Sequence, residues 1–202
     1  MTAASVQRPE QGAWRLASPA ALRWVDGRAT LERACLERAP ARVCLAGAGN
    51  AGDWRARVEA DELAYALAGE FGPERLGYAG RFGLRLTLSG AGAAVTGDGR
   101  VDLGAGHVTA DTDEGRRTLV AWRPGSVEAT LARDRLDARL RLPLADGGRL
   151  AATVGLGRDD RGELAGRIEM RVPDPAIVAE LVPQIGSIAG RVEADVELAG
   201  TL

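Results

Sequence analysis

Apolar and polar residues alternate with a period of two along most of the chain, which is typical of β-strands with one face turned toward apolar surroundings. The clearest alternating runs are residues 82–88, 136–144, 150–156 and 192–198. Glycine- and aspartate-rich turns, such as residues 146–148, separate the runs at intervals of roughly 10–15 residues. The pattern predicts an all-β fold, an elongated antiparallel β-meander whose strands each carry one apolar face.

Two stretches depart from the alternation and predict short helices at residues 61–71 and 174–182. A proline follows each stretch closely, and Asp174 can cap the second helix. A shift of 110 residues superimposes the first stretch and its following strand on the second, so that Gly80 falls on Gly190. This recurrence predicts a modular array. We divide the chain into a disordered leader (1–12), a β segment with a cysteine hairpin (13–60), a first helix-plus-strand repeat (61–172) and a truncated second repeat (173–202).

Composition and charge exclude several classes of protein. The chain has 26 basic and 28 acidic residues among 202, spread evenly, and so offers no basic patch for a nucleic acid. No run of about 18 uninterrupted apolar residues is present, so the sequence predicts no membrane-spanning helix in this piece. Only 4% of residues are aromatic, and much of the hydrophobic share is alanine, valine and leucine.

One motif, Gly47-x-Gly49-x-x-Gly52, matches the glycine pattern of a dinucleotide-binding loop. Such a loop must be followed by a helix, because the helix N-terminus holds the pyrophosphate. Residues 53–60 alternate like a strand instead, and no βαβ unit surrounds them. A dinucleotide-binding fragment therefore remains only a weaker alternative.

Cys35 and Cys44 each lie in a β-prone run, with Pro40 near the turn between them. An antiparallel hairpin would bring the two side chains face to face, within reach of a disulfide. Two buried thiols in a reducing compartment are equally consistent with this spacing.

No other group of residues predicts chemistry. His107 has no serine, cysteine or acid at a recognisable triad spacing, and we interpret it as a surface or strand histidine. The acidic segment 111–115 lacks the ligands and the glycine of an EF-hand loop and predicts a solvated turn. The sequence thus predicts a protein without catalytic residues, cofactor or metal.

The apolar strand faces allow two interpretations. They could pack against a second sheet as the core of a sandwich, or they could line an open groove. Because the strands offer mainly leucine, valine and alanine instead of large aromatic residues, the composition favours the groove.

Three segments resemble the TamB family, the inner-membrane subunit of the translocation and assembly module. They are the paired-cysteine run from Leu31 to Gly47, the Gly80–Gly90 strand after Pro73, and its second copy from Gly190 to Gly200 after Pro183. The resemblance covers residues 14–202. The chain has neither the N-terminal anchor nor the C-terminal region expected of a full-length member, which is consistent with an excised piece.

The resemblance implies a periplasmic protein, anchored in the inner membrane, whose sheet folds over into a taco-like trough with an apolar interior. It also implies phospholipid movement between the membranes, support of outer-membrane protein assembly, and the outer-membrane barrel TamA as a partner. An oxidising periplasm favours a disulfide between Cys35 and Cys44.

Our leading hypothesis is therefore a non-catalytic lipid conduit whose apolar groove binds phospholipid acyl chains. The residues expected to line the groove are Phe82, Leu84, Leu86, Leu88, Leu136, Leu140, Leu142, Val192, Val196 and Leu198. The alternative is a scaffold that pairs an exposed sheet edge with strands of outer-membrane proteins, without lipid transfer.

Overall fold

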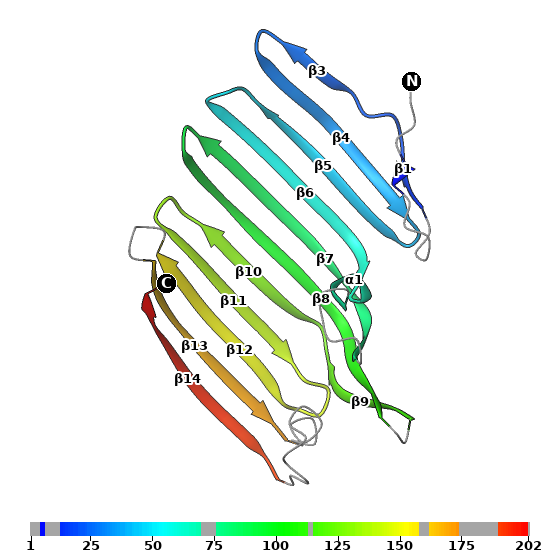
Figure 1. The fold of residues 1–202 in the computed structure, drawn as a ribbon, viewed down its shortest axis with the longest axis vertical. Coiled ribbons are helices and arrows are strands. Elements are labelled where there is room, and N and C mark those ends of the chain that lie inside the picture. Colours follow the sequence, from blue (N-terminus) through cyan, green and yellow to red (C-terminus); the bar gives the residue numbers. More distant parts are fainter. Residues whose placement is uncertain are drawn as a thin grey trace.

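The computed structural model describes residues 5–6, 13–69, 76–112, 115–157, 162–173 and 190–201. In this part of the chain, fourteen strands form one open sheet (Figure 1). Every described pair of neighbouring strands is antiparallel. The prediction of an antiparallel all-β fold is confirmed.

The N-terminal part of the sheet is built on a long central strand, β4, with two short strands along its outer edge. Its strands are β1 (Ser5–Val6), β2 (Trp14–Leu16), β3 (Leu22–Val25), β4 (Arg28–Arg38), β5 (Ala41–Gly49) and β6 (Asp53–Ala64). Strands β2 and β3 pair with opposite ends of β4, and β1 pairs with β2. Strand β1 falls within the predicted leader, residues 1–12. The other residues of the leader lie outside the described part of the chain.

The remaining strands follow one another as hairpins with one exception. They are β7 (Leu76–Ala91), β8 (Ala94–Thr112), β9 (Gly115–Trp122), β10 (Gly125–Leu131), β11 (Arg135–Pro143), β12 (Arg149–Gly157), β13 (Glu163–Val172) and β14 (Val192–Thr201). The long strand β8 pairs with β10 along its first half and with β9 along its second half. The sheet is therefore continuous from β4 to β14.

The prediction of a helix at residues 61–71 is wrong for residues 61–64, which belong to strand β6. Strand β6 continues to Ala64, where it pairs with Arg81 of β7, and among the described residues 61–69 only the single turn α1 (Ala66–Gly69) is helical. Asp61 pairs with Arg42 of β5, and Leu63 and Ala64 pair with β7 beyond a bulge. This pairing in the sheet overrides a local helical pattern. The second predicted helix, residues 174–182, lies outside the described residues.

One sheet runs through the division that we placed at residue 60, because β6 crosses it without interruption. The division into repeats stays a prediction. The sheet has no second layer over the described strands, and only five hydrophobic residues there are fully buried: Cys35, Ala41, Cys44, Ala60 and Leu144. The described chain therefore forms a single-layer sheet and not a sandwich.

Candidate functional site

The register of the sheet sorts the side chains onto two faces. Residues directly opposite each other on neighbouring antiparallel strands point to the same face. One row of such residues crosses ten strands, and each of its members is apolar: Leu36, Val43, Ala60, Leu84, Val101, Val127, Leu140, Ala152, Ile168 and Val196. We call the face that carries this row the apolar face.

A second row beside the first has the same character. It consists of Ala34, Leu45, Val58, Leu86, Gly99, Ala129, Ala138, Val154, Gly166 and Leu198. The apolar face therefore continues across the sheet from β4 to β14 without a charged residue in either row. No described element covers it except near α1.

The structure brings all of the predicted groove residues onto this one face. Leu84, Leu140 and Val196 lie in the first row, and Leu86 and Leu198 lie in the second. Phe82, Leu88, Leu136, Leu142 and Val192 lie on the same face in the flanking rows. Val196 is 45% exposed and the others are half-buried, so the side chains remain accessible from one side.

Several members of the apolar face were missed by the sequence analysis. Val101, Leu103 and Val127 connect the predicted residues of β7 with those of β11. In β8 the alternation does exist, but glycines occupy two of its apolar-face positions, Gly97 and Gly99. If glycine is counted as an apolar residue, the alternation continues along β8 and identifies these members of the apolar face.

Gly97 allows a close approach of its neighbour on the apolar face. A Cβ atom at this position would lie 2.2 Å from the carbonyl oxygen of Thr87 and 2.8 Å from Cδ2 of Leu88. The leucine side chain therefore spreads over the glycine on the adjacent strand. A larger residue at this position would displace the Leu88 side chain.

An aromatic cluster lies at one end of the apolar face. The ring of Tyr65 stacks on Phe82 with centroids 5.5 Å apart and meets Trp122 edge-on at 5.4 Å. The Tyr65 hydroxyl and the Trp122 indole N–H both donate to the carbonyl oxygen of Gly104, at 3.2 and 3.0 Å. Burial raises the pKa of the Tyr65 hydroxyl. The rings come from the turn after β6, from β7 and from β9, so no local sequence pattern predicts their meeting.

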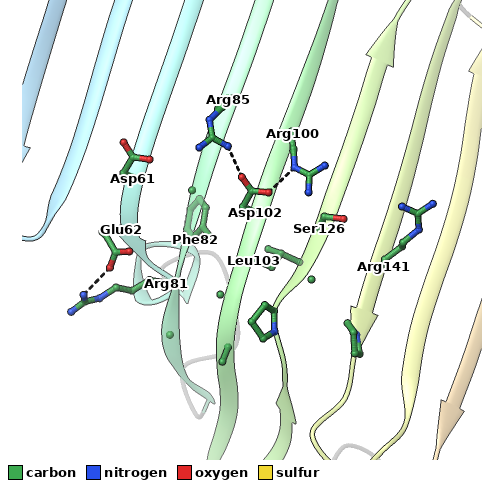
Figure 2. Close-up of a pocket in the computed structure, with 17 residues that line it drawn as sticks. Asp61, Glu62, Arg81, Phe82, Arg85, Arg100, Asp102, Leu103, Ser126 and Arg141 are labelled. Carbon is green, nitrogen blue, oxygen red and sulfur yellow. Dashed lines mark hydrogen bonds and ion pairs between the residues drawn. The ribbon is translucent and has the colours of Figure 1, made fainter.

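The opposite face is charged, and we call it the polar face. Its central ion pairs join neighbouring strands, as Figure 2 shows for part of the group. Asp102 accepts hydrogen bonds from Arg100 and from Arg85, each at 2.6 Å, and Arg100 also donates to Glu128 at 2.5 Å. The hydrogen bond from Arg100 lowers the pKa of the Asp102 carboxyl, and that from Arg85 adds to the effect while burial opposes it.

Further ion pairs extend this arrangement toward both ends of the sheet. They are Arg33–Glu59, Arg81–Glu62, Arg135–Asp137, Arg149–Glu169, Arg167–Asp195 and Arg171–Glu193. These side chains are half or more exposed in most cases, so each pair contributes little to stability. Their main effect is to keep the polar face solvated.

Cys35 and Cys44 form a disulfide between directly opposite positions of β4 and β5, with Cα atoms 4.0 Å apart. Cys44 is also opposite Glu59 of β6, which places the disulfide on the polar face. Both cysteines are buried, and the Arg33–Glu59 ion pair lies beside them. The disulfide cross-links the two strands of the β4–β5 hairpin and leaves the apolar face unoccupied.

A hollow of about 1010 Å³ lies over β6, β7, β8 and β10, and Figure 2 shows the side chains that line it. Its lining includes Asp61, Arg81, Arg85, Asp102 and Arg141. Two of these arginines, Arg81 and Arg85, already pair with carboxylates, and the lining contains neither histidine nor cysteine. Several charged side chains of the lining thus form ion pairs with one another.

The structure contradicts the dinucleotide alternative. Gly47 and Gly49 lie within strand β5, and Gly52 lies in the turn before strand β6. Because a strand and not a helix follows the glycines, no helix N-terminus is available to hold a pyrophosphate.

The other polar candidates also have structural positions. His107 lies in β8 between Ala79 and Ala121 of the neighbouring strands, as the interpretation of a strand histidine requires. Asp111 forms an ion pair with Arg116 at 2.9 Å. Among the described residues, no group of three or more histidine, cysteine or acidic side chains could hold a metal ion. No helix of the described part is long and apolar enough to span a bilayer.

The fold and its two faces define a class of protein: a single-layer antiparallel β-sheet with one uninterrupted apolar face. The sequence matches the family description "TamB, N-terminal domain" over residues 1–202, so the chain belongs to the TamB family, whose members are proteins of the cell envelope. No curated protein and no solved structure matches the chain.

Proposed function

We propose that the apolar face binds phospholipid acyl chains and that the chain is a non-catalytic segment of an envelope protein that carries phospholipid between the inner and outer membranes. The observation that carries the proposal is the pair of apolar rows that cross the sheet from β4 to β14 without a charge. An apolar surface of this extent on a soluble sheet marks a site that another apolar surface covers.

The energetics of acyl-chain binding support this function. Each methylene that leaves water for an apolar surface contributes about 0.8 kcal/mol. No specific pocket is needed, because neighbouring rows present similar leucine, valine, alanine and glycine side chains. A chain that moves from one strand to the next, a step of about 4.8 Å, exchanges one set of contacts for an equivalent set. Low specificity and a low barrier are what a conduit requires.

Membership in the TamB family supports a proposal for the wider cellular setting. We propose that the sheet of the whole protein folds over its apolar face into a taco-like trough, since sheets of many strands twist and coil. In this setting the protein lies in the periplasm, anchored in the inner membrane, with the outer-membrane barrel TamA as its partner in outer-membrane protein assembly. The Cys35–Cys44 disulfide agrees with an oxidising compartment.

The experiment is native mass spectrometry of the gently purified chain, followed by a transfer assay between donor and acceptor vesicles. Leu86→Asp and Leu140→Asp should abolish phospholipid adducts and transfer, because each places a charge in the middle of the apolar face. Thr153→Asp is the matched control, since Thr153 lies on the polar face, directly opposite Arg139, the chain neighbour of Leu140. Unchanged adducts and transfer in both leucine variants would contradict the proposal.

A second function rests on a different observation. Strand β14 pairs with β13 on one side, and no other described strand pairs with its outer side. We propose, as the alternative, that this edge pairs with strands of outer-membrane proteins. Binding of an outer-membrane-protein peptide should then be lost when proline replaces a β14 residue whose N–H faces away from β13, and it should be indifferent to Leu86→Asp.

A further inference from the structure

The outermost described hairpin carries large hydrophobic side chains that nothing covers. Leu22, Trp24 and Val25 of β3 are 71%, 72% and 63% exposed, whereas most leucines of the apolar face are half-buried. The turn that joins β3 to β4, at Asp26 and Gly27, lies at one extremity of the molecule's longest axis (Figure 1). These side chains can therefore reach a flat surface before the rest of the sheet does.

Three arginines lie beside this hairpin on the polar face. Arg28, Arg55 and Arg57 line one hollow together with the hydroxyl-bearing residues Thr87 and Ser89. In the register, Arg55 is flanked by Ala48 and Ser89, and Arg57 by Ala46 and Thr87, so no carboxylate is directly opposite either guanidinium on the neighbouring strands.

The three arginines differ in this respect from most others on the polar face. Arg85, Arg100 and Arg167, for example, each form an ion pair with a carboxylate on a neighbouring strand. No ion pair joins Arg28, Arg55 or Arg57 to another described residue. Their guanidinium groups are thus available to an external anion, with two hydroxyl groups as additional donors.

The apolar and basic groups belong to the same corner of the sheet. Trp24, Ala29, Gly49 and Trp54 form one row across β3, β4, β5 and β6. Arg28 and Arg55 are the chain neighbours of Ala29 and Trp54, and therefore lie one position away on the opposite face. We call Leu22, Trp24, Val25, Arg28, Arg55 and Arg57 the β3–β4 corner.

Acidic groups moderate the charge of this corner. Asp53 also lines the hollow, Asp26 lies in the turn, and Arg23 is neutralised by Glu32 at 3.2 Å. The excess positive charge is therefore small, and electrostatic attraction by itself would bind weakly. Weak electrostatic and apolar contributions do hold a protein at a membrane when the two act together.

We propose that the β3–β4 corner docks on the surface of an anionic phospholipid bilayer. The guanidinium groups of Arg28, Arg55 and Arg57 contact lipid phosphates, and Trp24 and Leu22 enter the interface, where tryptophan is favoured. Docking places this end of the apolar face next to the bilayer from which phospholipid could enter it. The inference does not require acyl-chain binding by the apolar face, so the two can succeed or fail separately.

The test is co-sedimentation of the chain with phosphatidylcholine vesicles that either contain or lack phosphatidylglycerol. Binding should require the anionic lipid and weaken with salt. Arg55→Ser combined with Arg57→Ser should lower the partition coefficient at least about tenfold, since each arginine near an anionic surface contributes roughly fivefold. Trp24→Ser should lower it by about the same factor.

Matched controls separate the corner from general charge and hydrophobicity. Arg139→Ser combined with Arg141→Ser removes the same charge from the polar face at β11, and Val196→Ser removes an exposed apolar side chain at the opposite edge. Both controls should bind vesicles like the unchanged chain. Leu86→Asp should also leave vesicle binding intact, even where it abolishes phospholipid adducts.

Four outcomes would overturn the inference. One is equal binding to neutral and anionic vesicles, and another is an equal loss in the Arg139/Arg141 control. The third is self-association in analytical ultracentrifugation that Trp24→Ser abolishes while vesicle binding stays unchanged, because the corner would then contact a second copy of the chain. Binding of inorganic phosphate at the hollow without vesicle binding would likewise exclude a bilayer as the partner.

Discussion

Gly80 and Gly190, 110 residues apart in the sequence, share an unusual backbone conformation, with φ angles of +114° and +125°. Residues with a side chain rarely adopt this region. Gly80 lies within β7, whereas Gly190 lies two residues before β14 begins. The internal repeat that aligns the two glycines stays a prediction from the sequence.

The two glycines differ in their surroundings, which allows backbone strain to be separated from packing. A Cβ atom at Gly190 would meet no described residue within 4 Å, whereas one at Gly80 would lie 2.6 Å from the carbonyl oxygen of Ala105 and 2.8 Å from the ring of Tyr65. Gly190→Ala should destabilise the fold by about 1–2 kcal/mol through strain alone. Gly80→Ala should cost about 1–3 kcal/mol more through overpacking. Urea unfolding measures both, and equal losses would contradict this account.

Trp54 lies over Gly90 of the neighbouring strand on the apolar face. A Cβ atom at Gly90 would be 2.0 Å from Nε1 of the indole, which must then move. Gly90→Ala should lower the free energy of unfolding by about 1–3 kcal/mol. Trp54→Ala removes the obstacle, so the double variant should lose less than the sum of the single variants. Strict additivity would show that the two side-chain positions do not interact.

Removal of the disulfide should affect stability more than lipid binding. The bond closes a short loop, and Cys35→Ala with Cys44→Ala should lower the free energy of unfolding by about 2–3 kcal/mol. Because the cysteines lie on the polar face, phospholipid adducts should persist under conditions where the variant is folded. Loss of adducts from a variant with an unchanged circular dichroism spectrum would contradict this placement.

The ion pairs around Asp102 predict a modest dependence of stability on pH. The hydrogen bond from Arg100 depresses the pKa of the Asp102 carboxyl in the folded state below its value of about 3.9 in the unfolded chain. The stabilisation is therefore complete above about pH 5 and is lost as the pH falls through the folded-state pKa. Solvent screening keeps it below about 1 kcal/mol.

Asp102→Asn should therefore reduce the difference in unfolding free energy between pH 7 and acidic pH. The control is Asp98→Asn, on the same strand, because the Asp98 carboxylate forms no ion pair with the described residues. If both variants changed the pH profile equally, the pairing with Arg100 would not be the cause.

The faces of the sheet were predictable from the sequence because successive side chains of a strand point to opposite sides. Leu136, Leu140 and Leu142 alternate with Asp137 and Arg139, and that alternation alone assigns them to one face. Strand β8 was harder, since glycines replace large apolar residues at its centre. The assignment of a strand face depends on hydrophobic side chains, and glycine has no side chain that would mark the face.

Other features depend on contacts between distant segments. Residues 61–64 have a helical pattern, yet β5 pairs with Asp61 and β7 pairs with Leu63 and Ala64, so the segment joins the sheet. The cluster of Tyr65, Phe82 and Trp122 assembles because the register of β6 to β9 brings the turn after β6, strand β7 and strand β9 together across β8. The association of exposed Trp24 with Arg55 and Arg57 has the same origin, as these residues lie on different hairpins.

The sequence by itself determined the antiparallel all-β fold, the apolar character of one face of each strand and the hairpin that brings Cys35 to Cys44. These features follow from local periodicity and turn chemistry, which act over a few residues. The tertiary structure decided that the sheet is a single layer, that the apolar residues of successive strands fall into continuous rows, and that the disulfide lies on the polar face. Register between strands sets these properties, because a slip of one residue would move every side chain of a strand to the other face.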